Sequence, residues 1–222
     1  MGRRSHERDD RRGGTIAGEP EGRFGVSATG RLDLPPESEW SADQKDVAER
    51  MSAGPRGGLS GPFLPLMHAP ELMMRVQQVG EYLRFGSHVP DDLFEVAVLT
   101  TARHWSQAFE WEHHRALALK ARVPSSVIDD VAAEQRPGSG RPEFGHTWDF
   151  VHALLTTGEV PDSVYARLER LGTPVVVELI TTVGYYTTLG LILNVARIPA
   201  PSGAVMLPVH DTGVDQRSDA TA

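Results

Sequence analysis

The sequence predicts an all-α protein, and three observations lead to this fold class. Apolar residues recur at intervals of three and four in successive segments between residues 70 and 172, which is helical spacing. No stretch alternates convincingly between apolar and polar residues, as a half-buried strand would. Several of the segments open with proline or with an aspartate or serine cap, and three close at glycine. These features together indicate a helical bundle.

The expected helices follow one another along the chain. A short first helix is expected over residues 41–53, because Ser41 can cap its start and the glycine-rich stretch after it would end it. Six longer segments with helical spacing come next: residues 70–86, 90–105, 106–122, 124–135, 144–158 and 161–172. The last expected helix, residues 175–199, is apolar around most of its circumference.

The composition divides the chain into four parts. Residues 1–40 are rich in Gly, Arg, Asp, Glu and Pro and are expected to form a disordered tail. Residues 41–58 are expected to be a short helix and a linker, and residues 59–200 the helical domain. Residues 201–222 are polar and are expected to be a flexible tail. Residues 1–40 and 205–222 lack the apolar residues that would offset the entropy of ordering them, so we expect these two segments to be dispensable for folding.

Charge and composition exclude several classes of function. The formal net charge is −8, and no cluster of Lys and Arg follows a helical pattern, so a nucleic acid is not an expected partner. The chain has no cysteine, which removes disulfides, thiolate nucleophiles and thiolate metal sites. Paired arginines near the start are not followed by an apolar stretch, so no secretory or twin-arginine signal is expected. These features predict a cytoplasmic protein.

The apolar segment 175–199 is about as long as a membrane-spanning helix. It is interrupted by Glu178, by Asn194 and by several threonines and tyrosines, and a carboxylate within a lone span is costly. We therefore expect a mostly buried helix of a bundle rather than a membrane-spanning helix, and no membrane is an expected partner. A helix this apolar offers more apolar surface than a small monomer can cover, so we expect a homo-oligomer, a dimer at least.

The segment 106–122 carries an unusual set of titratable side chains on its apolar face. At helical spacing one stripe contains Gln107, Glu110, Trp111, His114, Leu117, Ala118 and Ala121. The C-terminal half of this stripe is apolar and should face the core. Its N-terminal half lies on the same helix face, so Glu110 and His114 should also point inward. In the preceding segment, Glu95 shares a face with Val98, Leu99 and Ala102. Two neighbouring helices that each aim ionisable groups inward are the usual construction of a general acid/base pair.

A structural interpretation competes with this one. A single inward histidine is more often a hydrogen-bonded core residue than a catalyst, and a glutamate four residues from a histidine is often only an i,i+4 pair. Trp105 and Trp111 are most simply packing residues. The coincidence of Glu95, Glu110 and His114 on inward stripes favours a functional site. Burial should raise the pKa of Glu95, unless a protonated His114 lies close by and the pair shares one proton.

Residues 63–199 resemble the carboxymuconolactone decarboxylase family, an all-helical group that includes alkylhydroperoxidase D. The resemblance is strong to a cysteine-free branch with a pattern of the type E-x-x-x-L-x-x-A-R-x-W followed by [YF]-E-W-x-x-H. In this sequence the pattern is formed by Glu95, Leu99, Ala102, Arg103, Trp105, Phe109, Glu110, Trp111 and His114. The redox members of the family carry two cysteines where Gln107 and Glu110 stand here, with the histidine at the position of His114.

The resemblance implies an alkylhydroperoxidase D-like helical bundle, a homo-oligomer and a small-molecule substrate. Without cysteines the dithiol peroxidase chemistry of the redox members cannot run. The resemblance then implies a lyase or isomerase that acts on a small carboxylate or lactone, without a cofactor or a metal. By this resemblance, the catalytic residues would be Glu95, His114 and Glu110. The residues that contact the substrate would be Gln107, Trp111, Phe109, Trp105 and Arg103.

Two other classes remain open from the sequence. A metal enzyme would use Glu110 with His113 and Glu143 with His146, the E-x-x-H spacing of di-iron carboxylate bundles. Glu143, however, follows a proline in a glycine-rich region. The second class is a non-catalytic helical module, in which the inward polar residues only stabilise an oligomer.

Overall fold

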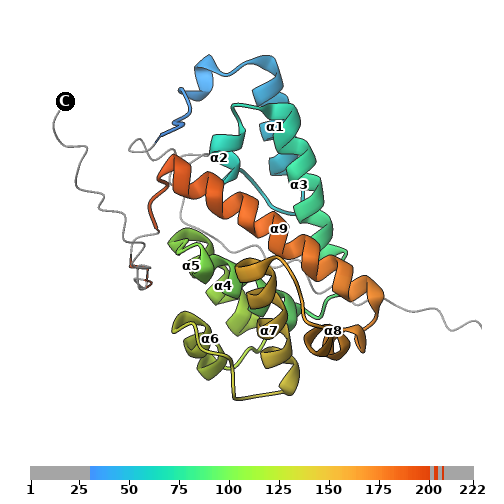
Figure 1. Ribbon diagram of the computed structural model, residues 1–222. Coiled ribbons are helices and arrows are strands. Elements are labelled where there is room, and N and C mark those ends of the chain that lie inside the picture. The colour runs from blue at the N-terminus through green and yellow to red at the C-terminus, as the bar shows by residue number, and fades with distance from the viewer. Residues whose placement is uncertain (1–30, 201–202, 205–206, 208–222) are drawn as a thin grey trace, which may run out of the picture. The chain divides into compact units, whose positions relative to one another are not determined.

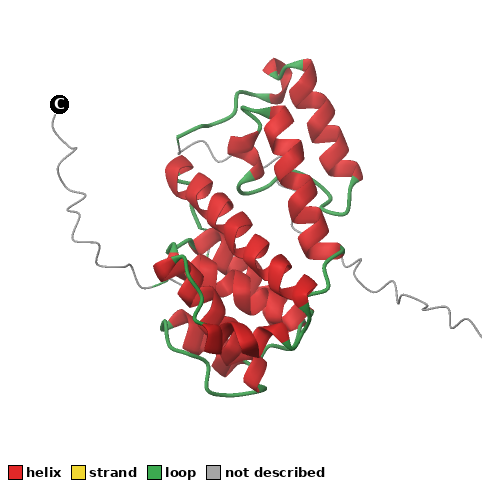
Figure 2. Cartoon of the chain, turned by 45° about the vertical axis from the view of Figure 1, so that its right-hand side comes forward, coloured by secondary structure: helices red, strands yellow, loops and turns green. Residues whose placement is uncertain are grey.

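The computed structural model describes residues 31–200, 203–204 and 207 (Figure 1). These residues form nine α-helices and one short 3-10 helix, and they contain no strand, which confirms the all-α prediction (Figure 2). The chain divides into two compact units, residues 1–87 and residues 88–222. The boundary between them falls inside the single domain that was expected over residues 59–200.

The first unit is built on three α-helices. They are α1 (Ala42–Ala53), α2 (Phe63–Leu66) and α3 (Pro70–Phe85), preceded by the 3-10 helix Glu37–Glu39. The helix α1 begins where the sequence predicted, because Ser41 and Gln44 form a reciprocal cap. The Ser41 hydroxyl accepts the backbone N–H of Gln44 at 3.2 Å, and the side-chain oxygen of Gln44 accepts the backbone N–H of Ser41 at 2.9 Å. The Gln44 amide also donates to the backbone carbonyl of Met67 at 3.0 Å, which ties α1 to the end of α2.

Packing in this unit starts earlier than residue 41. Leu34 and Trp40 are both buried, and the Trp40 indole N–H donates to the carbonyl of Pro35 at 2.9 Å. Burying two large apolar side chains offsets the entropy of ordering the short segment that carries them. The residues from 31 to 40 are therefore part of the packed unit rather than of the expected tail. Residues 1–30, and most of the expected tail over 201–222, lie outside the described residues.

In the second unit, several helices pack around one buried helix, α4 (Asp91–His104). The other helices of this unit are α5 (Ala108–Lys120), α6 (Ser125–Ala132), α7 (Pro142–Thr157), α8 (Asp162–Glu169) and α9 (Thr173–Ala196). The helices α5, α6, α7 and α9 all contact α4 (Figure 1). Every residue of α4 from Leu93 to Arg103 is consequently buried. A polar side chain on α4 therefore has to find its partner inside the protein.

The connection between α4 and α5 sets where α5 begins. Ser106 has a φ of 49°, in the left-handed region, and Gln107 is extended with φ −90° and ψ 96°. The helix α5 starts at Ala108, two residues later than the expected start at Ser106. The cause is that the Gln107 side chain caps the helix from outside it. Glutamine is not a favoured cap residue, so no local pattern predicts this start.

The helix α9 buries one side and exposes the other. Its buried side includes Glu178, Leu179, Val183, Tyr186, Leu189 and Leu193. Four large apolar residues are exposed on it: Val177, Ile180, Leu191 and Val195, at 56%, 47%, 42% and 56%. Among the described helices, α9 is the one long and apolar enough to cross a membrane, and 56% of that apolar window is buried in the protein. Core helices of soluble proteins meet the same criterion, so this is weak evidence for a membrane span.

Candidate active site

Three ionisable side chains from α4 and α5 meet in the interior of the second unit. Nδ1 of His114 lies 2.7 Å from Oε2 of Glu95, and Nε2 of His114 lies 3.5 Å from Oε2 of Glu110. The three residues are only 2%, 7% and 5% exposed, for His114, Glu95 and Glu110 in that order. One imidazole is therefore held between two buried carboxylates. We call this set of three residues the carboxylate–imidazole triad.

Local sequence and helix packing explain how the triad forms. Glu110 and His114 are four residues apart on α5, so they share one helix face, as predicted. The helices α4 and α5 are joined by a connection of only three residues and pack directly on each other. This packing places Glu95 of α4 against the buried face of α5. Trp111 and Ala118, also expected on that face, are buried as well.

The charges of the triad are coupled because they are close together and shielded from water. With all three groups ionised, two negative charges would face one positive charge in a buried site, which is unfavourable. The two carboxylates face the two nitrogens of one imidazole, so the charge that each group can carry depends on the charges of the other two. The contact to Glu95 has the length of a charge-assisted hydrogen bond, whereas the contact to Glu110 is longer than a good hydrogen bond.

An aromatic side chain of α9 completes the surroundings of His114. The ring of Tyr186 stands nearly perpendicular to the imidazole, at 86°, with their centroids 4.9 Å apart. Phe94 of α4 packs edge-on to the same tyrosine at 5.9 Å. In the sequence, the tyrosines of this segment interrupt an apolar run. Nothing local distinguishes Tyr186, since its place depends on how α9 packs against α4 and α5.

Gln107 supports the first turn of α5. Its side-chain oxygen accepts the N–H groups of Phe109 at 2.7 Å and Glu110 at 3.4 Å. Its side-chain nitrogen donates to the side-chain oxygen of Asn194, on α9, at 3.0 Å. Both ends of this amide are therefore engaged within the protein, and α9 holds the turn from which Glu110 projects.

The other residues expected to contact a substrate are engaged elsewhere or buried. Arg103 donates through Nε to the carbonyl of Ala132 at 2.8 Å and pairs with Glu134 at 3.0 Å, at the end of α6. The Trp105 indole donates to the hydroxyl of Thr187 on α9 at 3.1 Å. Trp111 is only 2% exposed, and Phe109 is half-buried.

The two E-x-x-H motifs do not converge in the structure. Glu110 faces His114, one turn along α5, while His113 is exposed to solvent. Glu143 lies in the first turn of α7. Within the described part of the chain, no group of three or more His, Asp or Glu side chains is arranged to hold a metal ion.

A further buried carboxylate has a partner of its own. Glu178 of α9 is 6% exposed, and its two oxygens contact the same residue, His88. One accepts the backbone N–H of His88 at 2.7 Å and the other lies 2.9 Å from its Nδ1. This pairing accounts for a carboxylate within an apolar helix and fixes the residue that opens the second unit.

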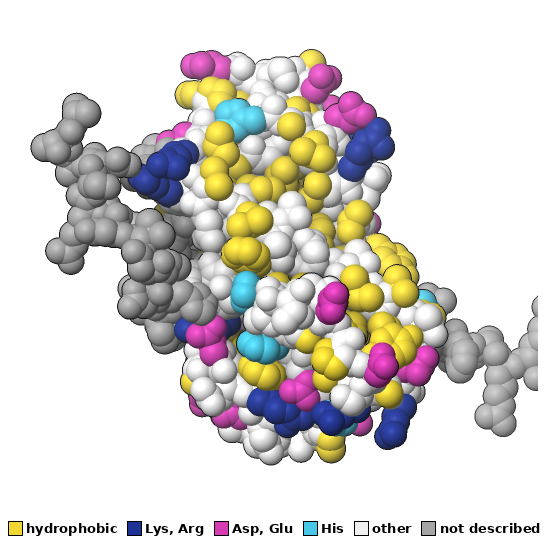
Figure 3. Space-filling view, in the orientation of Figure 1, with side chains coloured by type: hydrophobic (Ala, Val, Ile, Leu, Met, Phe, Trp, Pro, Cys, Tyr) yellow, Lys and Arg dark blue, Asp and Glu magenta, His cyan; other side chains and the backbone are white. Residues whose placement is uncertain are grey.

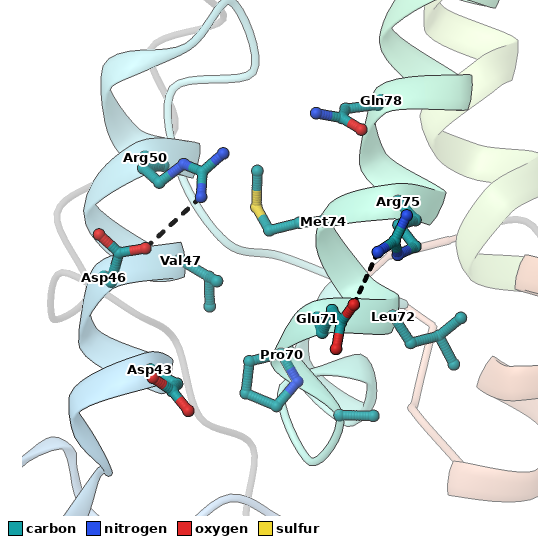
Figure 4. A pocket seen from close by; sticks show the side chains of 11 residues that line it. Asp43, Asp46, Val47, Arg50, Pro70, Glu71, Leu72, Met74, Arg75 and Gln78 are labelled. Carbon is teal, nitrogen blue, oxygen red and sulfur yellow. Dashed lines mark hydrogen bonds and ion pairs between the residues drawn. The ribbon is translucent and has the colours of Figure 1, made fainter.

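The first unit contains an open groove of about 770 Å³ between α1 and α3 (Figure 4). Its apolar lining includes Val47, Pro70, Leu72 and Met74. Ion pairs within each helix flank it: Asp46 with Arg50 at 3.5 Å on α1, and Glu71 with Arg75 at 2.7 Å on α3 (Figure 4).

The charges of the groove do not resemble those of the triad. A hydrogen bond and the positive charge of Arg75 hold the pKa of Glu71 below its usual value. Both pairs are exposed and lie along their own helices, so water screens them. The triad is therefore the stronger candidate for proton-transfer chemistry.

Compared with known protein families and with curated protein sequences, the chain matches none.

Proposed function

We propose that the protein is a cofactor-free lyase or isomerase that acts by acid/base catalysis on a small carboxylate or lactone. The observation that carries the proposal is the triad, in which one imidazole contacts two buried carboxylates through its two nitrogens. Such an arrangement can store a proton and pass it on near neutral pH. Glu95, His114 and Glu110 are the proposed catalytic residues.

The proposed chemistry needs only proton transfer. In decarboxylation, the bond from a substrate carbon to its carboxylate breaks, and the electron pair moves into a conjugated carbonyl as carbon dioxide leaves. The resulting enolate carbon then takes a proton from the triad. In an isomerisation, the same groups remove a proton from one carbon and return it to another. Glu95 would keep the imidazole oriented and charged, and Glu110 would exchange the proton with it.

The sequence pattern supports the choice of substrate class. The residues from Glu95 to His114 follow the pattern of the cysteine-free branch of the carboxymuconolactone decarboxylase family. A lactone or a small carboxylate is the substrate class this resemblance suggests. The chain has no cysteine for a dithiol peroxidase reaction.

A non-catalytic helical module is a second candidate, and the burial of the triad favours it. All three residues are at most 7% exposed, so a substrate reaches them only if the surrounding chain moves. In this alternative the triad joins α4 to α5 and has no chemistry to perform.

We also propose that the protein is a homo-oligomer and that the exposed side of α9 takes part in the contact. Figure 3 shows exposed hydrophobic side chains on the face that α9 crosses in Figure 1. The exposed Thr181 and Thr188 donate their hydroxyls to carbonyls of α9 itself, at 2.9 and 3.0 Å, so they add little polarity to this side. Val177 and Val195 end the apolar stripe, and exposed apolar surface of this kind is typical of protein contacts.

The test of the catalytic proposal is release of carbon dioxide from a panel of carboxylated lactones and β-keto acids. We expect release by the wild-type protein, and loss of most of it in Glu95→Gln and in His114→Gln. Phe150→Leu is the matched control, because Phe150 is a buried residue of α7 that takes no part in the triad. Equal rates in His114→Gln and wild type would contradict the proposed role of the triad. No release above buffer with any compound would favour the non-catalytic module.

A further inference from the structure

The environment of His114 includes a residue outside the carboxylate–imidazole triad. Tyr186 reaches the imidazole from α9 and is only 4% exposed. The two rings are nearly perpendicular at a centroid distance of 4.9 Å, an arrangement that aromatic pairs prefer. The ring of His113, which is exposed, also contacts His114, at 5.1 Å. Tyr186 is therefore a buried aromatic contact of the imidazole.

Tyr186 is itself held in place by rings on two helices. Phe94 contacts it at 5.9 Å and an interplanar angle of 73°, and Tyr185 contacts it at 5.2 Å and 85°. Phe94 is next in sequence to Glu95, so α4 supplies both the carboxylate that binds the imidazole and the ring that supports Tyr186. Tyr186 of α9 therefore contacts one residue of α4 and one residue of α5.

This packing bears on the orientation of the imidazole. The torsion that turns a histidine ring is broad, so hydrogen bonds or packing must fix the ring plane. The bond to Glu95 holds one nitrogen at 2.7 Å, and the other nitrogen lies 3.5 Å from Oε2 of Glu110, a contact longer than a good hydrogen bond. A ring packed at right angles to the imidazole restricts the rotation that would carry Nε2 away from Glu110.

We propose that Tyr186 is a positioning residue of the triad, which holds the His114 ring so that Nδ1 faces Glu95 while Nε2 faces Glu110. The role is assigned to the aromatic ring of Tyr186, because the contacts with His114 and Phe94 are made by the rings. This inference rests on the proposed function, because orientation of the imidazole matters only where it transfers a proton.

The experiment compares Tyr186→Phe with Tyr186→Leu by NMR of the His114 imidazole nitrogens across a pH titration. Loss of the His114 signals in His114→Gln assigns them among the nine histidines. Tyr186→Phe keeps the ring and should reproduce the wild-type nitrogen shifts and pKa. Tyr186→Leu should lower the pKa of His114 by roughly half a unit or more, towards the value in Glu110→Gln, because the contact to one carboxylate is weakened.

Two further variants keep the test decisive. Phe150→Leu removes a ring of a buried residue on α7, so it should lower stability and leave the His114 titration unchanged. Phe94→Leu removes the ring that supports Tyr186 and should shift the His114 titration in the same direction as Tyr186→Leu, by less. If Tyr186→Leu does not fold, Phe94→Leu alone carries the test.

The outcomes separate the two proposals. An unchanged His114 titration in both Tyr186→Leu and Phe94→Leu, with a clear change in Glu95→Gln, overturns the role of Tyr186 and leaves the triad standing. An unchanged titration in Glu95→Gln as well overturns the proposed function. A Tyr186→Phe that behaves like Tyr186→Leu would assign the role to the hydroxyl and contradict the ring-packing argument.

Discussion

Replacing Glu95 with glutamine should lower the pKa of His114 substantially. The substitution keeps the size of the side chain and removes its charge, 2.7 Å from Nδ1 of a histidine that is 2% exposed. An opposite charge this close to a buried group shifts a pKa by about 1–3 units. Each unit corresponds to about 1.4 kcal/mol, so the expected coupling is roughly 1.4–4 kcal/mol. A similar substitution of Glu110 should have a smaller effect, because its contact with His114 is 3.5 Å.

The assay is an NMR titration of His114 in wild type, Glu95→Gln and Glu110→Gln, with chemical denaturation of each protein at several pH values. The carboxylate of Glu95 stabilises the charged imidazole, so the wild type gains stability over Glu95→Gln as the pH falls through the pKa of His114. That gain disappears at lower pH, where Glu95 itself becomes protonated. An identical pKa of His114 in wild type and Glu95→Gln would show that the two residues do not communicate, and the proposed site would be wrong.

Further substitutions test the triad, the packing of the first unit and the exposed side of α9. If the triad acts as one unit, Glu95→Gln combined with His114→Gln should lose little more activity than either change alone, and additive losses in the rate of carbon dioxide release would argue against a shared role. In the first unit, Leu34→Ala should lower the free energy of unfolding by about 2 kcal/mol, because it removes a buried side chain. Leu32 is 49% exposed, so Leu32→Ala should change the free energy of unfolding by less than about 0.5 kcal/mol. Equal losses for the two variants in a denaturant titration would contradict the buried position of Leu34. The double variant Ile180→Asp, Leu191→Asp places two charges on the exposed apolar side of α9 and should convert the oligomer into a 24.3 kDa monomer. Light scattering measures the mass of both proteins. A wild-type protein that is already monomeric at micromolar concentration would refute the proposed oligomer.

Hydrophobic periodicity was sufficient to predict the fold class and the inward face of α5. Glu110, Trp111, His114 and Ala118 are the buried residues of that helix, and all four lie on the predicted stripe. The position of Glu95 was also predictable, because a carboxylate in an apolar row has to be paired or protonated. The pairing of Glu95 with His114 follows once the short connection between α4 and α5 is known to fold them against each other.

Other parts of the site depend on contacts that no local pattern encodes. Gln107 was assigned to the stripe of α5, but its side chain instead caps the helix and reaches Asn194, 87 residues further along the chain. Tyr186 meets His114 across 72 positions of sequence, and a tyrosine in an apolar run resembles any other core tyrosine. The early start of packing at Leu34 was hidden by the polar and glycine-rich composition around it.

No local sequence pattern predicts the division into two units either. The segments on either side of Ser87 show the same helical spacing, so periodicity gives no sign of a boundary between them. The pairing of His88 with Glu178 joins residues 90 positions apart, and it marks where the second unit begins.

The measurement that tests the central claim most directly is proton exchange between a bound lactone and solvent. A carboxylated lactone with an acidic proton next to its carbonyl is incubated in deuterated water, and deuterium in the recovered compound is measured by mass spectrometry. This readout detects proton transfer by the triad even where no carbon dioxide is released. The account predicts that wild-type protein and Phe150→Leu incorporate deuterium faster than buffer does, and that His114→Gln does not. Incorporation by His114→Gln at the wild-type rate would contradict it.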